Sequence, residues 1–104
     1  VDDQLGRPTW VRNLADTVLD LIALGESGVW HVADGGTATW RELAETAIRV
    51  AGVEAEVAGV STETWGAAAP RPRYSVLDLS ATEARLGRAM TTWPDALRTF
   101  LEQR

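Results

Sequence analysis

The chain has no cysteine, no lysine and only one histidine, His31. Without cysteine it cannot form a disulfide framework or a metal site built on thiolates. His31 has neither a second histidine nor a closely spaced pair of carboxylates with which to share a metal ion, so the sequence predicts no metal site. We interpret His31 as a structural residue of its segment.

Positive charge is also scarce, since the formal net charge is −5. This balance argues against a broad surface for nucleic acid or for an anionic membrane, although a local cluster of arginines would still bind one phosphate group. No apolar run approaches the ~20 residues of a membrane span, and no signal peptide is visible. We therefore expect a cytoplasmic protein with no nucleic-acid partner and no membrane partner.

The length of 104 residues corresponds to one domain. The sequence begins at Val1 rather than at methionine, which is typical of the interior of a larger protein. Processing or trimming would give the same start, so the sequence leaves open whether the chain is a fragment or a stand-alone module.

The strongest helical pattern lies near the start of the chain. Apolar residues recur at the spacing of one helical face, at Leu14, Val18, Leu21 and Ile22, and predict a helix over residues 11–24. Thr9 precedes this pattern, and its hydroxyl is expected to cap the helix by accepting a bond from a backbone N–H group.

Three further helices are predicted from their first residues. Thr39-Trp40-Arg41-Glu42 is a capping-box pattern, and the helix that it begins is expected to end near Gly52. Ser80-Ala81-Thr82-Glu83 is a second pattern of this kind, before a short helix that stops at Gly87. Thr92-Trp93-Pro94-Asp95 begins the last helix, with proline in its first turn.

Strand signals are fewer and shorter. Residues 29–33 are rich in β-formers and apolar on both alternating faces, which predicts a strand that is covered on both sides in a parallel sheet. Residues 57–60 are a second expected strand, residues 1–4 a strand end, and residues 62–65 a helical turn within a loop. The pattern as a whole indicates an α/β fold that is mostly helical with a few short strands.

The stretch Arg71-Pro72-Arg73-Tyr74-Ser75-Val76-Leu77-Asp78 is the most distinctive in the chain. Pro70 and Pro72 restrict the backbone on both sides of Arg71, so its side chain starts from a stiff segment. A guanidinium held in this way suits a phosphate group, because its planar fork can bond two oxygens at once. Tyr74, the only tyrosine, would lie beside it. The alternative interpretation is a surface loop that the prolines only shorten.

A second polar group surrounds the turn before the first helix. Gln4, Arg7 and Thr9 cluster there and are able to contact a small anion or a sugar, although capping and solvation would explain them equally well. Gly35-Gly36 lacks the spacing of a phosphate-binding loop, so we interpret it as an ordinary turn.

Five tryptophans are many for a chain of this length. Trp30, Trp40 and Trp93 fall on expected helices and strands, and we expect them in the core. Trp65 falls in a loop shortly before Arg71, where it would either line the rim of a pocket or pack locally.

These segments together resemble the dTDP-4-dehydrorhamnose reductases. The matching stretches are Asp3-Gln4-Leu5-Gly6-Arg7-Pro8-Thr9 with Asn13-Leu14-Ala15, Gly28-Val29-Trp30-His31, Thr39-Trp40-Arg41-Glu42-Leu43-Ala44, residues 71–78, and Trp93-Pro94-Asp95-Ala96-Leu97. Their order and spacing agree over nearly the whole chain. Asn13 stands where the family usually has aspartate, and Trp30 stands where it usually has tyrosine.

The resemblance implies that the chain is the C-terminal, substrate-binding part of an extended short-chain dehydrogenase/reductase, in the Rossmann-like NAD(P)-binding superfamily. In that family an N-terminal Rossmann domain, absent here, binds NADPH and carries the catalytic Tyr-x-x-x-Lys pair. A chain without lysine cannot hold that pair, so no catalytic residue is expected here. The implied ligand is a dTDP-4-keto-deoxysugar. Arg71 is the residue expected at its diphosphate, and Gln4, Arg7, Thr9, Tyr74 and Trp65 are further candidates.

Two other functions stay open on the sequence alone. One is a non-catalytic binding or regulatory module of the same fold, and the other is part of a nucleotide-sugar epimerase or dehydratase. The expected partner in the whole protein is its own Rossmann domain. Without that domain, the strand at residues 29–33 and the apolar face of the first helix would be uncovered, so we expect self-association or poor order over the first third of the chain.

Overall fold

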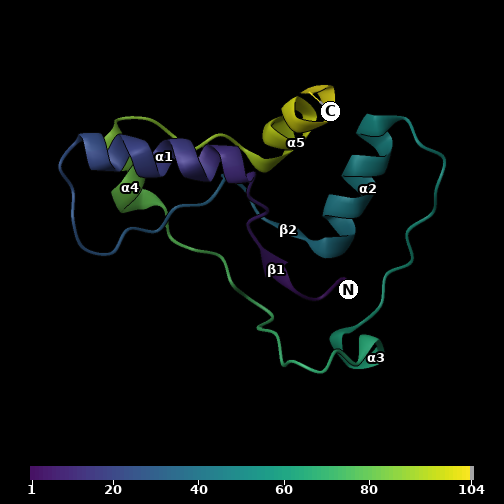
Figure 1. Cartoon of the computed structure of the whole chain (residues 1–104). Helices are drawn as coiled ribbons and strands as arrows, with labels where there is room; N and C mark the ends of the chain where they lie inside the picture. The colour runs from purple at the N-terminus through teal and green to yellow at the C-terminus, as the bar shows by residue number, and fades with distance from the viewer. Residues whose placement is uncertain (104) are drawn as a thin grey trace.

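The structure, a computed structural model, describes residues 1–103 and contains five helices and a two-stranded sheet (Figure 1). In chain order the elements are β1 (Leu5–Gly6), α1 (Val11–Ala23), β2 (Ala38–Thr39), α2 (Trp40–Ala51), α3 (Thr62–Trp65), α4 (Ser80–Leu86) and α5 (Trp93–Gln103). The prediction of a mostly helical α/β chain with a few short strands is confirmed, and all the expected helices are present.

The sheet lies at the centre of the molecule (Figure 1). β1 and β2 are antiparallel, with Leu5 opposite Thr39 and Gly6 opposite Ala38. The other edge of β1 bonds to the segment around Tyr74. The Leu5 N–H donates to the Arg73 carbonyl at 2.8 Å, and the Ser75 N–H donates to the Leu5 carbonyl at 2.9 Å. β1 therefore lies between two extended segments that are far apart in the sequence.

Two expected strands are not present. Residues 29–33 have no regular secondary structure and pair with no strand within residues 1–103. Val29 is 91% exposed, so within residues 1–103 the start of this segment is uncovered, as expected for the chain without a Rossmann domain, whereas Ala33 at its end is buried. Residues 57–60 are also without a partner strand, and their one backbone bond to the N-terminal segment joins Asp2 N–H to the Val60 carbonyl.

The beginning of α2 agrees with the sequence pattern, and the beginning of α4 does not. The Thr39 side chain accepts from Glu42 N–H, and the Glu42 carboxylate accepts from Thr39 N–H, which completes the capping box. In α4, Ser80 is already the first helical residue. The Asp78 carboxylate accepts a hydrogen bond from the Ser80 N–H at 2.9 Å. Asp78 therefore caps α4 in the place of the Ser80 hydroxyl. This hydrogen bond holds the pKa of Asp78 below its usual range.

The beginning of α1 differs in a similar way. Its N-cap is Trp10, and the Thr9 hydroxyl does not cap it. Thr9 instead donates to the Arg7 carbonyl and accepts from the Asp34 N–H. The Asp34 carboxylate accepts from the Trp10 N–H at 2.9 Å and from the Asn13 side chain at 3.0 Å. A buried aspartate from a distant segment therefore caps α1.

The core is small and is divided between two places. One cluster consists of Ala33, Leu79 and Met90, with the partly buried Val32 and Leu86 packed against it. Trp93 and Ala96 are buried where α5 packs toward α2. Trp93 is in the core as expected. Trp30 is only half-buried and Trp40 is 62% exposed, so the expectation that both are core residues is wrong.

The chain is flat and exposes more surface than a compact domain of its size. Its radius of gyration is 15.6 Å, against about 13 Å for a compact chain of 100 residues. Its accessible area of 6927 Å² exceeds the roughly 5,700 Å² expected from its mass by about 1,200 Å². The large radius and the excess of accessible area reflect surfaces of the helices and loops that no other part of residues 1–103 covers.

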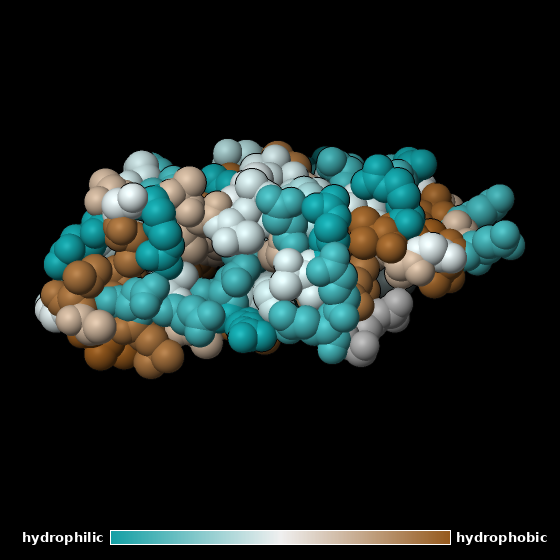
Figure 2. Space-filling view, turned by 90° about the horizontal axis from the view of Figure 1, so that it is seen from above, coloured by the Kyte–Doolittle hydropathy of each residue, from teal (hydrophilic) through white to brown (hydrophobic). Residues whose placement is uncertain are grey.

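The outer face of α1 is the largest of these uncovered surfaces. Of the apolar face predicted for this helix, Leu21 is buried, whereas Leu14, Val18 and Ile22 are 37%, 42% and 65% exposed. Val11 and Leu19 add to the uncovered surface, at 73% and 62% exposed. Figure 2 shows hydrophobic residues gathered at the end of the molecule that carries α1 in Figure 1. The face buried within the chain is a narrow one made by Thr17 and Leu21.

Candidate functional site

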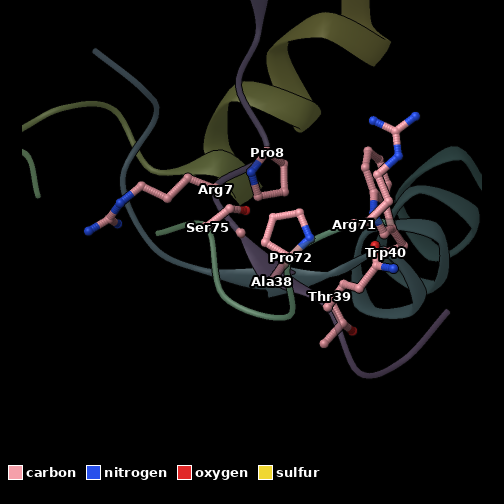
Figure 3. A pocket seen from close by; sticks show the side chains of 10 residues that line it. Arg7, Pro8, Ala38, Thr39, Trp40, Arg71, Pro72 and Ser75 are labelled. Atoms are coloured by element: carbon pink, nitrogen blue, oxygen red, sulfur yellow. The ribbon is translucent and has the colours of Figure 1, made fainter. Parts of the chain in front are cut away.

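A cavity of about 350 Å³ opens beside the central sheet, and we call it the arginine cavity. Its walls come from β1, β2, the first residue of α2 and the segment 71–75 (Figure 3). The residues that line it are Gln4, Gly6, Arg7, Pro8, Ala38, Thr39, Trp40, Arg71, Pro72 and Ser75. The fold therefore brings together three of the residues singled out in the sequence, namely Gln4, Arg7 and Arg71.

The backbone of β1 positions the segment that carries Arg71. Leu5 is bonded to Arg73 and Ser75 on one side and paired with Thr39 on the other. Glycine at position 6 suits this close approach, because a Cβ atom there would lie 3.1 Å from the Ser75 Oγ, closer than an ordinary contact. The stiffness expected from the two prolines is thus supplemented by direct pairing with the sheet.

Arg71 and Arg73 flank Pro72 but differ in their surroundings. Arg73 pairs with Glu63, and its other terminal nitrogen lies 3.8 Å from an oxygen of Asp3. Arg71 is exposed at the cavity and has no ion pair or side-chain hydrogen bond within residues 1–103. An unpaired guanidinium beside a cavity is the feature that phosphate recognition requires, because its donors remain available.

Arg7 lines the same cavity, but its guanidinium is hydrogen-bonded to backbone carbonyls. Its Nε donates to the Leu77 carbonyl and a terminal nitrogen donates to the Gly36 carbonyl, both at 2.8 Å. In Figure 3 this guanidinium points away from the side of the cavity that carries Arg71. Arg7 therefore ties three segments together around the cavity, and its stem forms part of the wall.

Gln4 is held at the cavity through α3. Its side-chain amide donates to the Thr62 hydroxyl at 3.3 Å. The carboxylate of Asp3 accepts from both the hydroxyl and the backbone N–H of Thr62, and these hydrogen bonds hold the pKa of Asp3 below its usual range. Asp3 stays ionised at neutral pH and anchors the N-terminal segment to α3.

The remaining three candidates do not line the arginine cavity. Thr9 lines a second cavity of about 360 Å³, which we call the aromatic cavity. Its walls include Trp10, Trp40, Trp93, Leu97 and Phe100. Tyr74 and Trp65 are 69% and 68% exposed and line neither cavity. A contact of Thr9, Tyr74 or Trp65 with a ligand stays a prediction.

The sequence did not predict the roles of two residues, Trp40 and Asp34. Trp40 lines both cavities, although its place in a helical pattern indicated a core position. Asp34 is 1% exposed and bonds to the start of α1, yet only its position at the end of an apolar run indicated burial. Neither role follows from spacing along the chain, since both depend on contacts with distant segments.

The described part of the chain was also searched for metal sites and membrane spans. Within residues 1–103, no group of three or more histidine, aspartate or glutamate side chains is placed to hold a metal ion. None of the helices in this range combines the length and the hydropathy needed to cross a bilayer.

A family model described as "RmlD substrate binding domain" matches residues 1–104. The spore coat polysaccharide biosynthesis protein SpsK of Bacillus subtilis is 38% identical over 104 residues, which are 100% of this chain and 36% of that protein. A dTDP-4-dehydrorhamnose reductase of Streptomyces griseus is 37% identical over 93% of this chain and 34% of its own length. The chain thus spans about a third of these curated relatives.

Solved structures agree. The dTDP-4-dehydrorhamnose reductase of Bacillus anthracis, solved in complex with NADP, superposes with a TM-score of 0.92 at 34% identity, over 99% of this chain and 37% of that one. A dTDP-4-dehydrorhamnose reductase of Clostridium acetobutylicum superposes with a TM-score of 0.93 at 31% identity, with the same coverage. The resemblance drawn from the sequence motifs is confirmed at the level of family and fold.

Proposed function

Because this chain belongs to the RmlD substrate-binding domain family, we propose that it forms the nucleotide-sugar side of the substrate cleft in a reductase of dTDP-4-keto-sugars in deoxysugar biosynthesis. The observation that carries this proposal is the unpaired Arg71 at the arginine cavity. Its guanidinium would bond the diphosphate, while Gln4 and the stem of Arg7 would line the same cleft. The names of the relatives favour a reductase over an epimerase or a dehydratase.

In this proposal the chain supplies recognition and another part of the whole protein supplies the chemistry. The chain has no lysine, so it lacks the Tyr-x-x-x-Lys pair of short-chain dehydrogenases. NADPH would bind outside this chain, to the cofactor domain that the resemblance implies. The presence of NADP in the Bacillus anthracis structure supports NADPH as the reductant.

The first test is binding by the chain itself. We expect saturable binding of dTDP at the arginine cavity, measured by NMR titration of the ¹⁵N-labelled chain, and weaker binding of thymidine, which has no phosphate.

We also expect no NADPH oxidation when the chain alone is mixed with dTDP-4-keto-6-deoxy-L-mannose. Turnover by the chain alone, or equal affinity for dTDP and thymidine, would contradict the proposal.

We further propose that the cofactor-binding part of the whole protein covers the outer face of α1. The exposed Val11, Leu19 and Ile22 support this, as does the excess of accessible area. An inter-domain interface within one chain typically buries about 600–1,500 Å², which is the range of that excess.

The chain by itself is therefore expected to self-associate through α1. Light scattering coupled to size exclusion should detect a species larger than one chain, with an apparent mass that rises with concentration. Leu19→Glu with Ile22→Glu should shift it to the monomer, since the two charges would be buried in the contact. Val53→Glu, at an exposed apolar residue outside α1, is the control. A strict monomer at all concentrations would contradict this expectation.

A further inference from the structure

Trp40 has an unusual position for a tryptophan. It is the first residue of α2 and directly follows the Thr39 cap, so its backbone is fixed by the capping box. Its side chain is 62% exposed and forms a wall that the arginine cavity and the aromatic cavity share. Figure 3 shows Trp40 and Arg71 on the same side of the arginine cavity. A rigid aromatic surface therefore lies beside the unpaired guanidinium.

The wall of the arginine cavity to which Trp40 belongs has an apolar part. Pro8, Ala38 and Pro72 line the cavity with it and offer no side-chain donor or acceptor. The polar side chains there are partly satisfied by the protein, since Thr39 bonds to Glu42 and Arg7 bonds to two carbonyls. A sugar ring needs partners for several hydroxyl groups, whereas a nucleobase presents a π-face that an indole can stack on.

We propose that Trp40 stacks on the base of a nucleoside diphosphate whose phosphates bond to Arg71. This inference rests on the proposed function, because it names the base-binding residue of the same cavity. Aromatic stacking on a base contributes enough that removing it weakens binding by roughly five- to a hundredfold. The contribution depends on the aromatic face, so Trp40→Phe should keep most of it and Trp40→Leu should lose it.

The test follows the indole N–H signals of the ¹⁵N-labelled chain during titration with dTDP, inorganic pyrophosphate and glucose 1-phosphate. Trp40→Phe removes one indole signal and so assigns it. We expect dTDP to move the Trp40 indole signal and the Arg71 Nε–H signal together. Pyrophosphate should move only the Arg71 signal. Trp40→Leu should weaken dTDP binding at least fivefold and leave the affinity for pyrophosphate unchanged, with an unaltered circular dichroism spectrum as evidence of folding.

The other outcomes separate the two proposals. If dTDP moves the Arg71 signal but not that of Trp40, stacking is wrong and the phosphate site stands. If glucose 1-phosphate moves the Trp40 signal and dTDP does not, the indole contacts the sugar instead of the base. If neither signal moves with any of the three probes, both the stacking and the proposed function fail.

Discussion

Replacing Arg71 by alanine is expected to weaken dTDP binding about ten- to a hundredfold, because a charge-assisted hydrogen bond to phosphate contributes roughly 1.5–3 kcal/mol. The side chain is exposed and unpaired within residues 1–103, so its removal should leave the fold unchanged. Arg71→Lys should be intermediate, since lysine keeps the charge but cannot bond two oxygens with one planar group.

Arg73→Ala is the matched control. It removes the same charge two residues away, but from a guanidinium that is paired with Asp3 and Glu63. Exposed ion pairs of this kind contribute roughly 0–1 kcal/mol, so we expect dTDP affinity to fall by no more than about fivefold. Calorimetric or NMR titration of both variants at one salt concentration makes the comparison. Equal losses for the two variants would indicate a general charge effect and remove Arg71 from the site.

The same substitution gives a kinetic prediction for the reductase that we propose as the whole protein. Arg71→Ala should raise KM for the dTDP-sugar and leave the affinity for NADPH unchanged, because the cofactor binds elsewhere in our proposal. A dissociation constant for NADPH measured by fluorescence supplies the second half of that comparison. If Arg71→Ala left KM for the sugar nucleotide unchanged, the proposed role of Arg71 would be wrong. The same holds if the variant bound dTDP with unchanged affinity.

Replacing Asp34 by alanine is expected to lower the free energy of unfolding by about 2–4 kcal/mol, the sum of a lost helix cap and a lost buried charge-assisted bond. Asp34 is 1% exposed and satisfies both the Trp10 N–H and the Asn13 side chain. Its removal leaves these two half-buried donors without their partner. A whole domain has only about 5–15 kcal/mol of stability, so the unfolding transition should move markedly or disappear.

Asp16→Ala is the control for Asp34→Ala, since Asp16 is exposed on the same helix. A change within about 0.5 kcal/mol is expected there. Urea unfolding followed by circular dichroism measures both variants. Equal midpoints for the two variants would show that Asp34 does not hold α1 in place.

A swap of two residues tests the same contact from the other side. The related reductases usually carry aspartate at position 13, where this chain has Asn13. Asn13→Asp alone would set two carboxylates against each other at a hydrogen-bond distance and should destabilise the chain. Asn13→Asp with Asp34→Asn restores one donor amide and one carboxylate, so the double variant should recover most of the loss. Additive losses in the double variant would mean that the pair does not interact.

The helices of this protein were determined by the sequence itself. Three local signals predicted helices: the apolar spacing of α1, the Thr39 capping box of α2 and Pro94 in the first turn of α5. Each of these helices is present at the predicted residues. The Arg71 segment was also visible in the sequence, because two prolines around an arginine restrict the backbone whatever the fold is.

The tertiary structure decided which arginine side chains remain free to bind a ligand and which are bonded to other parts of the protein. The sequence pointed to Arg71 as the phosphate-binding residue and to Arg7 as a further candidate, but it did not show that Arg7 and Arg73 bond to carbonyl and carboxylate groups of distant segments. Residues 29–33 show the same limit, because a strand forms in a sheet only where another strand pairs with it. Trp40 has a helical pattern that suits a core, yet the packing of α2 leaves it at a cavity. Local propensity sets where a helix begins, whereas exposure and pairing depend on neighbours that the linear order does not reveal.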